Sequence, residues 1–174
     1  MPKLGPILRK ISLLCGLTVA GPSLLALATS DIPEYGMKAM LFYRLSQFVY
    51  WPGGEKPGPT PVLCIAGSNP FGSALNQIAA NAGIEVRSAG SDPSGCHLIF
   101  IARSETAALE RWLQRAEQKR IVTVSDIPGF ARQGGMIELP LEGERVAIVV
   151  NRRNAQKQGF EFNTQLLRLA RGVE

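Results

Sequence analysis

Short apolar runs alternate along this chain with longer segments whose apolar residues recur every three or four positions. The runs have strand length and end at glycine, proline or small polar residues, which predicts buried strands at 62–66 and 97–102 and further strands at 84–88 and 121–124. The periodic segments predict helices at 33–50, 70–82 and 104–119, and a last helix that Asn163 caps. Two further strands are expected at 136–139 and 146–150, around an acidic turn.

The first predicted helix has a strongly apolar side, and Pro52 is expected to stop it. The side chains that share this side should pack on the core, and they are Met37, Met40, Leu41, Leu45, Phe48 and Val49. The proline- and glycine-rich stretch 52–61 follows, which excludes helix and central strand there. It is too short to separate two domains.

The alternation of strands and helices predicts an α/β fold in a single domain. We expect a mostly parallel central sheet of about five to six strands, flanked by helices and joined by right-handed crossovers. The last two predicted strands are close enough in sequence to form a hairpin, which leaves open an antiparallel edge.

The amino-terminal segment is typical of a secretory signal peptide. Lys3, Arg9 and Lys10 give a basic start, an apolar stretch follows, and Ala26-Leu27-Ala28 provides the small residues of a cleavage site. We therefore expect residues 1–28 to be removed and residues 29–174 to form the exported domain. An uncleaved membrane anchor is the alternative, although Gly16, Gly21 and Pro22 would interrupt such a helix.

Removing this segment changes the charge of the protein. The whole chain has a formal net charge of +5, and the segment carries three basic residues and no acidic one, so the mature domain is near +2. Its basic residues are scattered apart from a small cluster at Arg152, Arg153 and Lys157. This is too weak a footprint for nucleic-acid binding.

Candidate chemistry concentrates after the predicted strands, where Arg103, Ser125 and Asp126 lie. Asp126 is expected to cap the turn after it, with contact to a small ligand or partner by Ser125 and Asp126 as the alternative. A hydrolase would need a nucleophile elbow and a late histidine, and the sequence has neither. The one histidine, His97, has no ligand cluster at zinc spacing. We therefore expect no catalytic residues, no metal and no cofactor.

Partner contacts are more plausible at Tyr50, Trp51 and Arg152. Aromatic and arginine side chains are common anchors in protein interfaces. Core packing is the alternative for Trp51, and a solvated helix start is the alternative for Arg152. The first predicted helix as a whole is also a candidate surface.

These residues together resemble the YfiR family over about residues 36–170, in the order and spacing of several short blocks. The blocks are Lys38-Ala39-Met40-Leu41-Phe42-Tyr43 with Phe48-Val49-Tyr50-Trp51-Pro52, Val62-Leu63-Cys64-Ile65-Ala66-Gly67, Cys96-His97-Leu98-Ile99-Phe100-Ile101, Thr123-Val124-Ser125-Asp126, Gly134-Gly135-Met136-Ile137 and Leu166-Leu167-Arg168-Leu169-Ala170. The resemblance implies a periplasmic regulatory protein that restrains a membrane-bound diguanylate cyclase and so lowers cyclic di-GMP and biofilm formation. A homodimer is left open.

The resemblance also places cysteines at Cys64 and Cys96, the pair that remains after signal removal. An even pair in an oxidising compartment favours a disulfide. Closing this loop of about 33 residues would add roughly 3–4 kcal/mol in the chain-entropy model. Two free, buried cysteines are the alternative. A second cysteine pair, which some relatives carry, is absent from this sequence.

A periplasmic small-ligand receptor that reports to a membrane sensor is the alternative function. Such a receptor needs a concave site lined by convergent polar groups. The structure should separate the two hypotheses by whether Arg103, Ser125 and Asp126 converge on one cavity.

Overall fold

The computed structural model describes residues 34–54 and 60–173. The predicted signal segment, residues 1–28, lies outside the described residues. In the described part of the chain, no helix has the length and apolar character needed to cross a bilayer.

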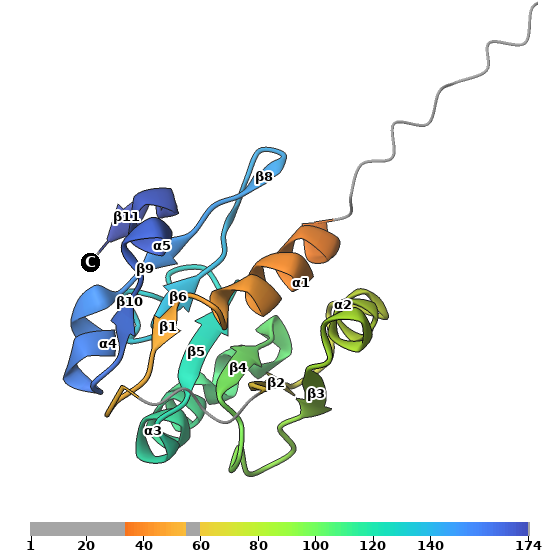
Figure 1. Cartoon of the computed structure of the whole chain (residues 1–174), viewed down its shortest axis with the longest axis horizontal. Helices are drawn as coiled ribbons and strands as arrows, with labels where there is room; N and C mark the ends of the chain where they lie inside the picture. The colour runs from red at the N-terminus through yellow and green to blue at the C-terminus, as the bar shows by residue number, and fades with distance from the viewer. Residues whose placement is uncertain (1–33, 55–59, 174) are drawn as a thin grey trace, which may run out of the picture. The chain divides into compact units, whose positions relative to one another are not determined.

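A seven-stranded sheet forms the centre of the described domain, and this confirms the predicted α/β fold with a mostly parallel sheet (Figure 1). Its order is β11-β9-β6-β5-β4-β2-β3. The bounds are β2 (Val62–Ala66), β3 (Glu85–Ser88), β4 (Leu98–Ile101), β5 (Val122–Ser125), β6 (Ile137–Glu138), β9 (Val149–Val150) and β11 (Gly172–Val173).

The chain reverses its direction of travel across the sheet between β2 and β4. It passes from β2 outward to β3 and then to β4, on the other side of β2. In open α/β sheets the loops at the carboxyl side of such a reversal are the usual ligand site. Here those loops begin at Gly67 and Ala102.

Each face of the sheet buries its own core, because successive side chains along a strand point to opposite faces. Leu63 and Ile65 of β2 belong to the larger core, whereas Cys64 and Ala66 belong to the smaller one. The larger core receives residues of α1 (Glu34–Leu45), α2 (Ala74–Ala82), α4 (Arg152–Lys157) and α5 (Thr164–Leu169). The smaller core is covered by α3 (Leu109–Lys119).

An aromatic cluster anchors α1 and the loop before α2 to the sheet. The ring of Phe71 lies 4.7 Å from that of Phe100 on β4 and 6.0 Å from that of Phe42 on α1, measured between centroids. All three side chains are buried. Edge-to-face and stacked arrangements of this kind add to the burial of apolar area.

The helix ends follow local sequence signals in two cases. Gly83 ends α2 in the left-handed conformation, at φ 65°, as its glycine predicts. The side chain of Asn163 accepts a hydrogen bond from the backbone N–H of Gln165, and it caps α5 as expected.

The prediction for the first helix was wrong at its carboxyl end. The helix ends at Leu45, and a turn leads into β1 (Val49–Tyr50). This strand pairs antiparallel with β10 (Glu161–Phe162). The pairing joins segments more than a hundred residues apart, so the local periodicity of residues 33–50 carried no sign of it.

The start of the helix before β5 also differs from the prediction. A 3-10 helix, η1 (Arg103–Ala108), precedes α3, and Ser104 makes no capping bond to it. The Ser104 hydroxyl instead accepts a hydrogen bond from the backbone N–H of Ser68. The tertiary contact therefore takes the side chain that the sequence assigned to a cap.

The predicted carboxyl-terminal hairpin is divided into two parts. Antiparallel β6 and β9 lie within the large sheet, with β11 parallel to β9 at the edge. Between them, β7 (Leu141–Glu142) and β8 (Arg145–Val146) form a separate two-stranded hairpin. The antiparallel pair is therefore one strand inside the edge, because the last residues of the chain return to the sheet.

Candidate functional site

Asp126 is the centre of a buried polar cluster at the carboxyl end of β5. Its Oδ2 atom accepts hydrogen bonds from the Tyr35 hydroxyl at 2.9 Å and from Lys38 Nζ at 2.7 Å. Arg103 Nε lies 3.1 Å from the same oxygen. The other oxygen, Oδ1, is buried and has no hydrogen-bond partner among the described residues.

Lys38 is fully buried and lies between two carboxylates. Its Nζ contacts Asp126 and also Glu34, one turn earlier on α1. Burying a charge is costly unless it is paired, so these carboxylates are what make the position tolerable for lysine. The cluster fastens α1 to the end of β5. Burial raises the pKa of Tyr35, and the hydrogen bond to Asp126 raises it further.

Ser125 turns away from this cluster. Its hydroxyl donates to the Ile101 carbonyl at 2.6 Å and accepts from the Ile127 N–H at 3.0 Å. Ser125 is therefore the residue that stabilises the turn after β5. The sequence predicts that Asp126 does this, and the prediction is wrong because the ammonium group of Lys38 and the Tyr35 hydroxyl hold the Asp126 carboxylate.

The loops at the reversal of the sheet are tied to each other. The Ser68 N–H donates to the Ser104 hydroxyl at 2.9 Å. Gly67 lies so close to Ser104 and Glu105 that a side-chain carbon at this position would collide with both. In such sheets a ligand usually binds between these two loops, but here the loops contact each other directly. Arg103 and Asp126 meet each other, and Ser125 does not join them.

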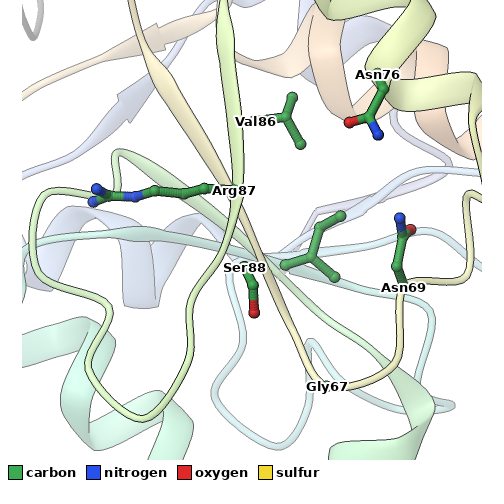
Figure 2. A pocket seen from close by; sticks show the side chains of 7 residues that line it. Gly67, Asn69, Asn76, Val86, Arg87 and Ser88 are labelled. Carbon is green, nitrogen blue, oxygen red and sulfur yellow. The ribbon is translucent and has the colours of Figure 1, made fainter.

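A small hollow of about 200 Å³ with a mixed polar and apolar lining lies beside these loops, at the carboxyl ends of β2 and β3. Its lining is Ile65, Gly67, Asn69, Asn76, Val86, Arg87 and Ser88 (Figure 2). The Asn69 amide is occupied by the backbone of Phe71 and Gly72. Arg87 extends away from the hollow and donates to the Ser94 carbonyl at 2.7 Å. Few polar groups are therefore left to bind a ligand there.

A larger and more apolar hollow lies between α1 and β8, and we call it the α1 groove. Its volume is about 500 Å³, and it is lined by Gly36, Met37, Met40, Leu41, Arg145 and Val146. The sequence predicts that Met37, Met40, Leu41, Leu45, Phe48 and Val49 pack on the core. Leu45 and Val49 are buried, and Leu41 and Phe48 are partly buried against the larger core. The prediction is wrong for Met40, which is exposed, and the buried face of α1 also carries Lys38, Ala39 and Phe42.

The tertiary structure decides this rotation of α1. Phe42 enters the aromatic cluster, and Lys38 reaches Asp126. Met40 is left 42% exposed. The signal that sequence reasoning missed was Lys38 itself, because a lysine four residues before a core phenylalanine lies on the same face of the helix.

The predicted contact residues near β1 divide into exposed and buried. Tyr50 is 52% exposed, and its hydroxyl accepts from the Asn163 amide at 3.3 Å. Trp51 is buried in the larger core, and its indole N–H has no partner among the described residues. Arg152 is exposed at the first position of α4.

The family model described as YfiR/HmsC-like matches residues 35–171. This is nearly the whole described domain. The chain belongs to the YfiR/HmsC-like family.

Two solved structures share the fold of this YfiR/HmsC-like chain at low identity. A conserved domain protein from Vibrio cholerae O1 biovar El Tor is 12% identical with a TM-score of 0.59, and the match covers 80% of this chain and 60% of that one. The ABC domain in complex with L-Trp from Streptococcus pneumoniae is 11% identical with a TM-score of 0.57, and the match covers 78% and 60%. At such identities the likeness shows the fold alone. No curated protein sequence matches the chain.

A disulfide joins Cys64 and Cys96 in this YfiR/HmsC-like domain, with their Cα atoms 5.8 Å apart. It connects Cys64, in the middle of β2, to Cys96, two positions before β4 begins. Strands β2 and β4 are neighbours in the sheet. Next to it, the imidazole Nδ1 of His97 accepts from the Val62 N–H at 2.8 Å. Burial lowers the pKa of His97, and the nearby Arg87 lowers it further.

Metal binding gains no support from the described residues. Among them, no group of three or more histidine, cysteine, aspartate or glutamate side chains is arranged to hold a metal ion. The polar cluster at Asp126 neutralises its own charges, since two cations face two carboxylates. The arrangement therefore fixes α1 to the end of β5.

Proposed function

We propose that this chain is a periplasmic regulatory protein that restrains a membrane-bound diguanylate cyclase. The observation that carries the proposal is the YfiR/HmsC-like match over residues 35–171. The pattern of residues 1–28 supports export and cleavage after Ala28. The mature protein would act through binding and without a cofactor.

The site geometry favours a binding role over catalysis. The carboxylate of Asp126 is engaged by Lys38 and Arg103, and the hydroxyl of Ser125 by backbone groups. We propose that these residues and Trp51 act indirectly, by holding the surfaces that a partner would contact. Tyr50 and Arg152 are the exposed residues of the predicted contact set.

The test is the cyclic di-GMP content of cells, measured by mass spectrometry. Deleting the gene should raise cyclic di-GMP and biofilm mass, and the full-length gene should restore both. A gene that lacks codons 2–28 serves as the matched control, because its product would stay on the wrong side of the membrane and should not restore them. Unchanged cyclic di-GMP after deletion would rule out the proposal.

A second candidate function is a small-ligand receptor, and the observation that supports it is Asn76, whose side chain points toward the hollow at the ends of β2 and β3. The test is thermal unfolding of the mature protein with a panel of small polar metabolites. A stabilising compound whose effect disappears in Asn76→Ala would support the receptor, because Asn76 points toward the hollow. The absence of any stabilising compound would leave the regulator as the proposal.

A further inference from the structure

We propose that the α1 groove is the docking site for one amphipathic helix of the partner, with acidic residues beside its apolar face. This inference rests on the proposed function, and it places the contact with the membrane-bound protein on α1 and the β7–β8 hairpin. The occupant is a segment of the partner's periplasmic region.

The apolar surface of the groove extends beyond its lining. Leu141 pairs directly with Val146 in the hairpin, so the two side chains lie on the same face. Leu141 and Met40 are each 42% exposed. Contiguous apolar surface on a folded domain marks an interaction site more often than isolated exposed residues do.

The shape of the surface favours a helix over a membrane. The groove is a hollow between a helix and a hairpin, whereas a bilayer needs a flat or protruding apolar face. Helices dock into such grooves through side chains spaced one turn apart. Met37 and Met40 are unbranched and flexible, which lets them adapt to the side chains that enter.

Charge defines the partner further. Arg145 lines the groove, and Arg44 lies one helical turn beyond Met40 on α1. Neither arginine forms an ion pair among the described residues, and the nearby Glu142 is taken by Arg171 at 2.8 Å. One arginine in the lining and one a turn beyond it are complementary to acidic residues that flank an apolar stripe.

The position of α1, which forms one wall of the groove, is fixed by contacts on its opposite, buried face. The Lys38–Asp126 pair and the aromatic cluster fix the opposite face of α1. A surface that is ordered before binding loses less conformational entropy when the partner arrives.

The first experiment is photocrosslinking in intact cells that carry the full-length gene. A benzoylphenylalanine is placed at Met40, and the matched control carries it at Arg111, an exposed residue of α3 on the other face of the sheet. We expect an adduct from position 40 alone, with a periplasmic peptide of the cyclase that has an apolar stripe and acidic flanks. An adduct with a second copy of this chain, an adduct with phospholipid, or equal adducts from both positions would overturn the proposal, as would no adduct.

The second experiment reverses the charges. Arg145→Glu and Arg44→Glu should each reduce the amount of crosslinked cyclase by about tenfold, since like charges would then face each other. Arg111→Glu makes the same change in charge away from the groove and should leave the adduct as it is. Circular dichroism confirms that each variant is folded.

The two proposals fail in different ways. If gene deletion leaves cyclic di-GMP unchanged, the proposed function fails. Suppose instead that deletion raises cyclic di-GMP and that the Arg145→Glu gene lowers it again as far as the wild-type gene does. The proposed regulatory function then stands, but the α1 groove is not the docking site.

Discussion

Replacing Asp126 by alanine should destabilise the protein far more than its position at the end of a strand suggests. The substitution removes the acceptor of three groups, Tyr35, Lys38 and Arg103. It leaves the ammonium group of Lys38 fully buried with Glu34 as its remaining partner. Asp126 therefore tests whether α1 is held by this buried pair.

The expected magnitude follows from burial. Removing one partner of a buried ion pair costs about 3–5 kcal/mol, because the other charge stays in the interior without compensation. Glu34 still neutralises part of the Lys38 charge, so we expect about 3 kcal/mol for Asp126→Ala. Arg103→Ala should cost no more than about 1 kcal/mol, because this side chain is 53% exposed and water screens it.

Urea unfolding of the oxidised protein measures these losses, and the two buried tryptophans, Trp51 and Trp112, supply the fluorescence signal. Lys38→Met provides the second arm of a double-mutant cycle. With the ammonium group gone, Asp126→Ala should cost about 2 kcal/mol less than it does in the wild type. Glu117→Ala, which removes an exposed carboxylate of α3, is the control.

Two results would refute the reasoning. A loss below about 1 kcal/mol for Asp126→Ala would mean that the pair does not hold α1. An equal loss in the wild type and in Lys38→Met would mean that the cost comes from a cavity and not from the unpaired charge.

Three further predictions follow from other parts of the domain. Burial lowers the pKa of His97 in the folded state, so its imidazole takes up a proton more readily in the unfolded chain, and the contribution of His97 to stability should fall as pH drops below about 6.5; His97→Gln should flatten the decrease in urea midpoints between pH 7 and pH 5, and an unchanged slope would contradict this. Replacing Cys64 and Cys96 by alanine together opens the loop that the disulfide closes and should cost about 3–4 kcal/mol; a midpoint equal to that of the oxidised wild type would show that the bond contributes nothing. Gly135→Ala places a carbon 2.1 Å from Cε1 of Phe130, which is far inside van der Waals contact, and should cost about 1–3 kcal/mol in the same assay, so wild-type stability would mean that the two do not pack as described.

The disulfide illustrates what the residues and the family resemblance could predict and what they could not. The sequence offered two cysteines at the starts of predicted strands, and the pairing depended on whether these strands were neighbours. The parallel registry of β2 with β4 brings the Cα atoms to 5.8 Å, and the alternative of two free cysteines is excluded for this structure. Adjacency of strands is a property of the sheet order, which local pattern does not contain.

The candidate site was less predictable than the fold. The sequence pointed to the carboxyl ends of the strands, and Arg103 and Asp126 do meet there. It could not show that Asp126 reaches back to Lys38, 88 residues earlier in the chain. The sequence named the first helix as a candidate surface but not the α1 groove beside it, since the apolar face of a helix looks alike in sequence whether it packs on the core or lines a groove.

Local patterning by itself determined the main strands and helices of this protein. The apolar runs at β2, β4 and β5 specify buried strands because both of their faces must be covered, and Gly83 ends α2 because it adopts a left-handed conformation without strain. Only the tertiary structure decided which side of α1 faces the core. It also decided that the residues after α1 form β1, which pairs with β10. These choices depend on partners far away in sequence, namely Asp126 and the 161–162 strand, and a helix of mixed apolar faces turns toward whichever partner gives the lower free energy.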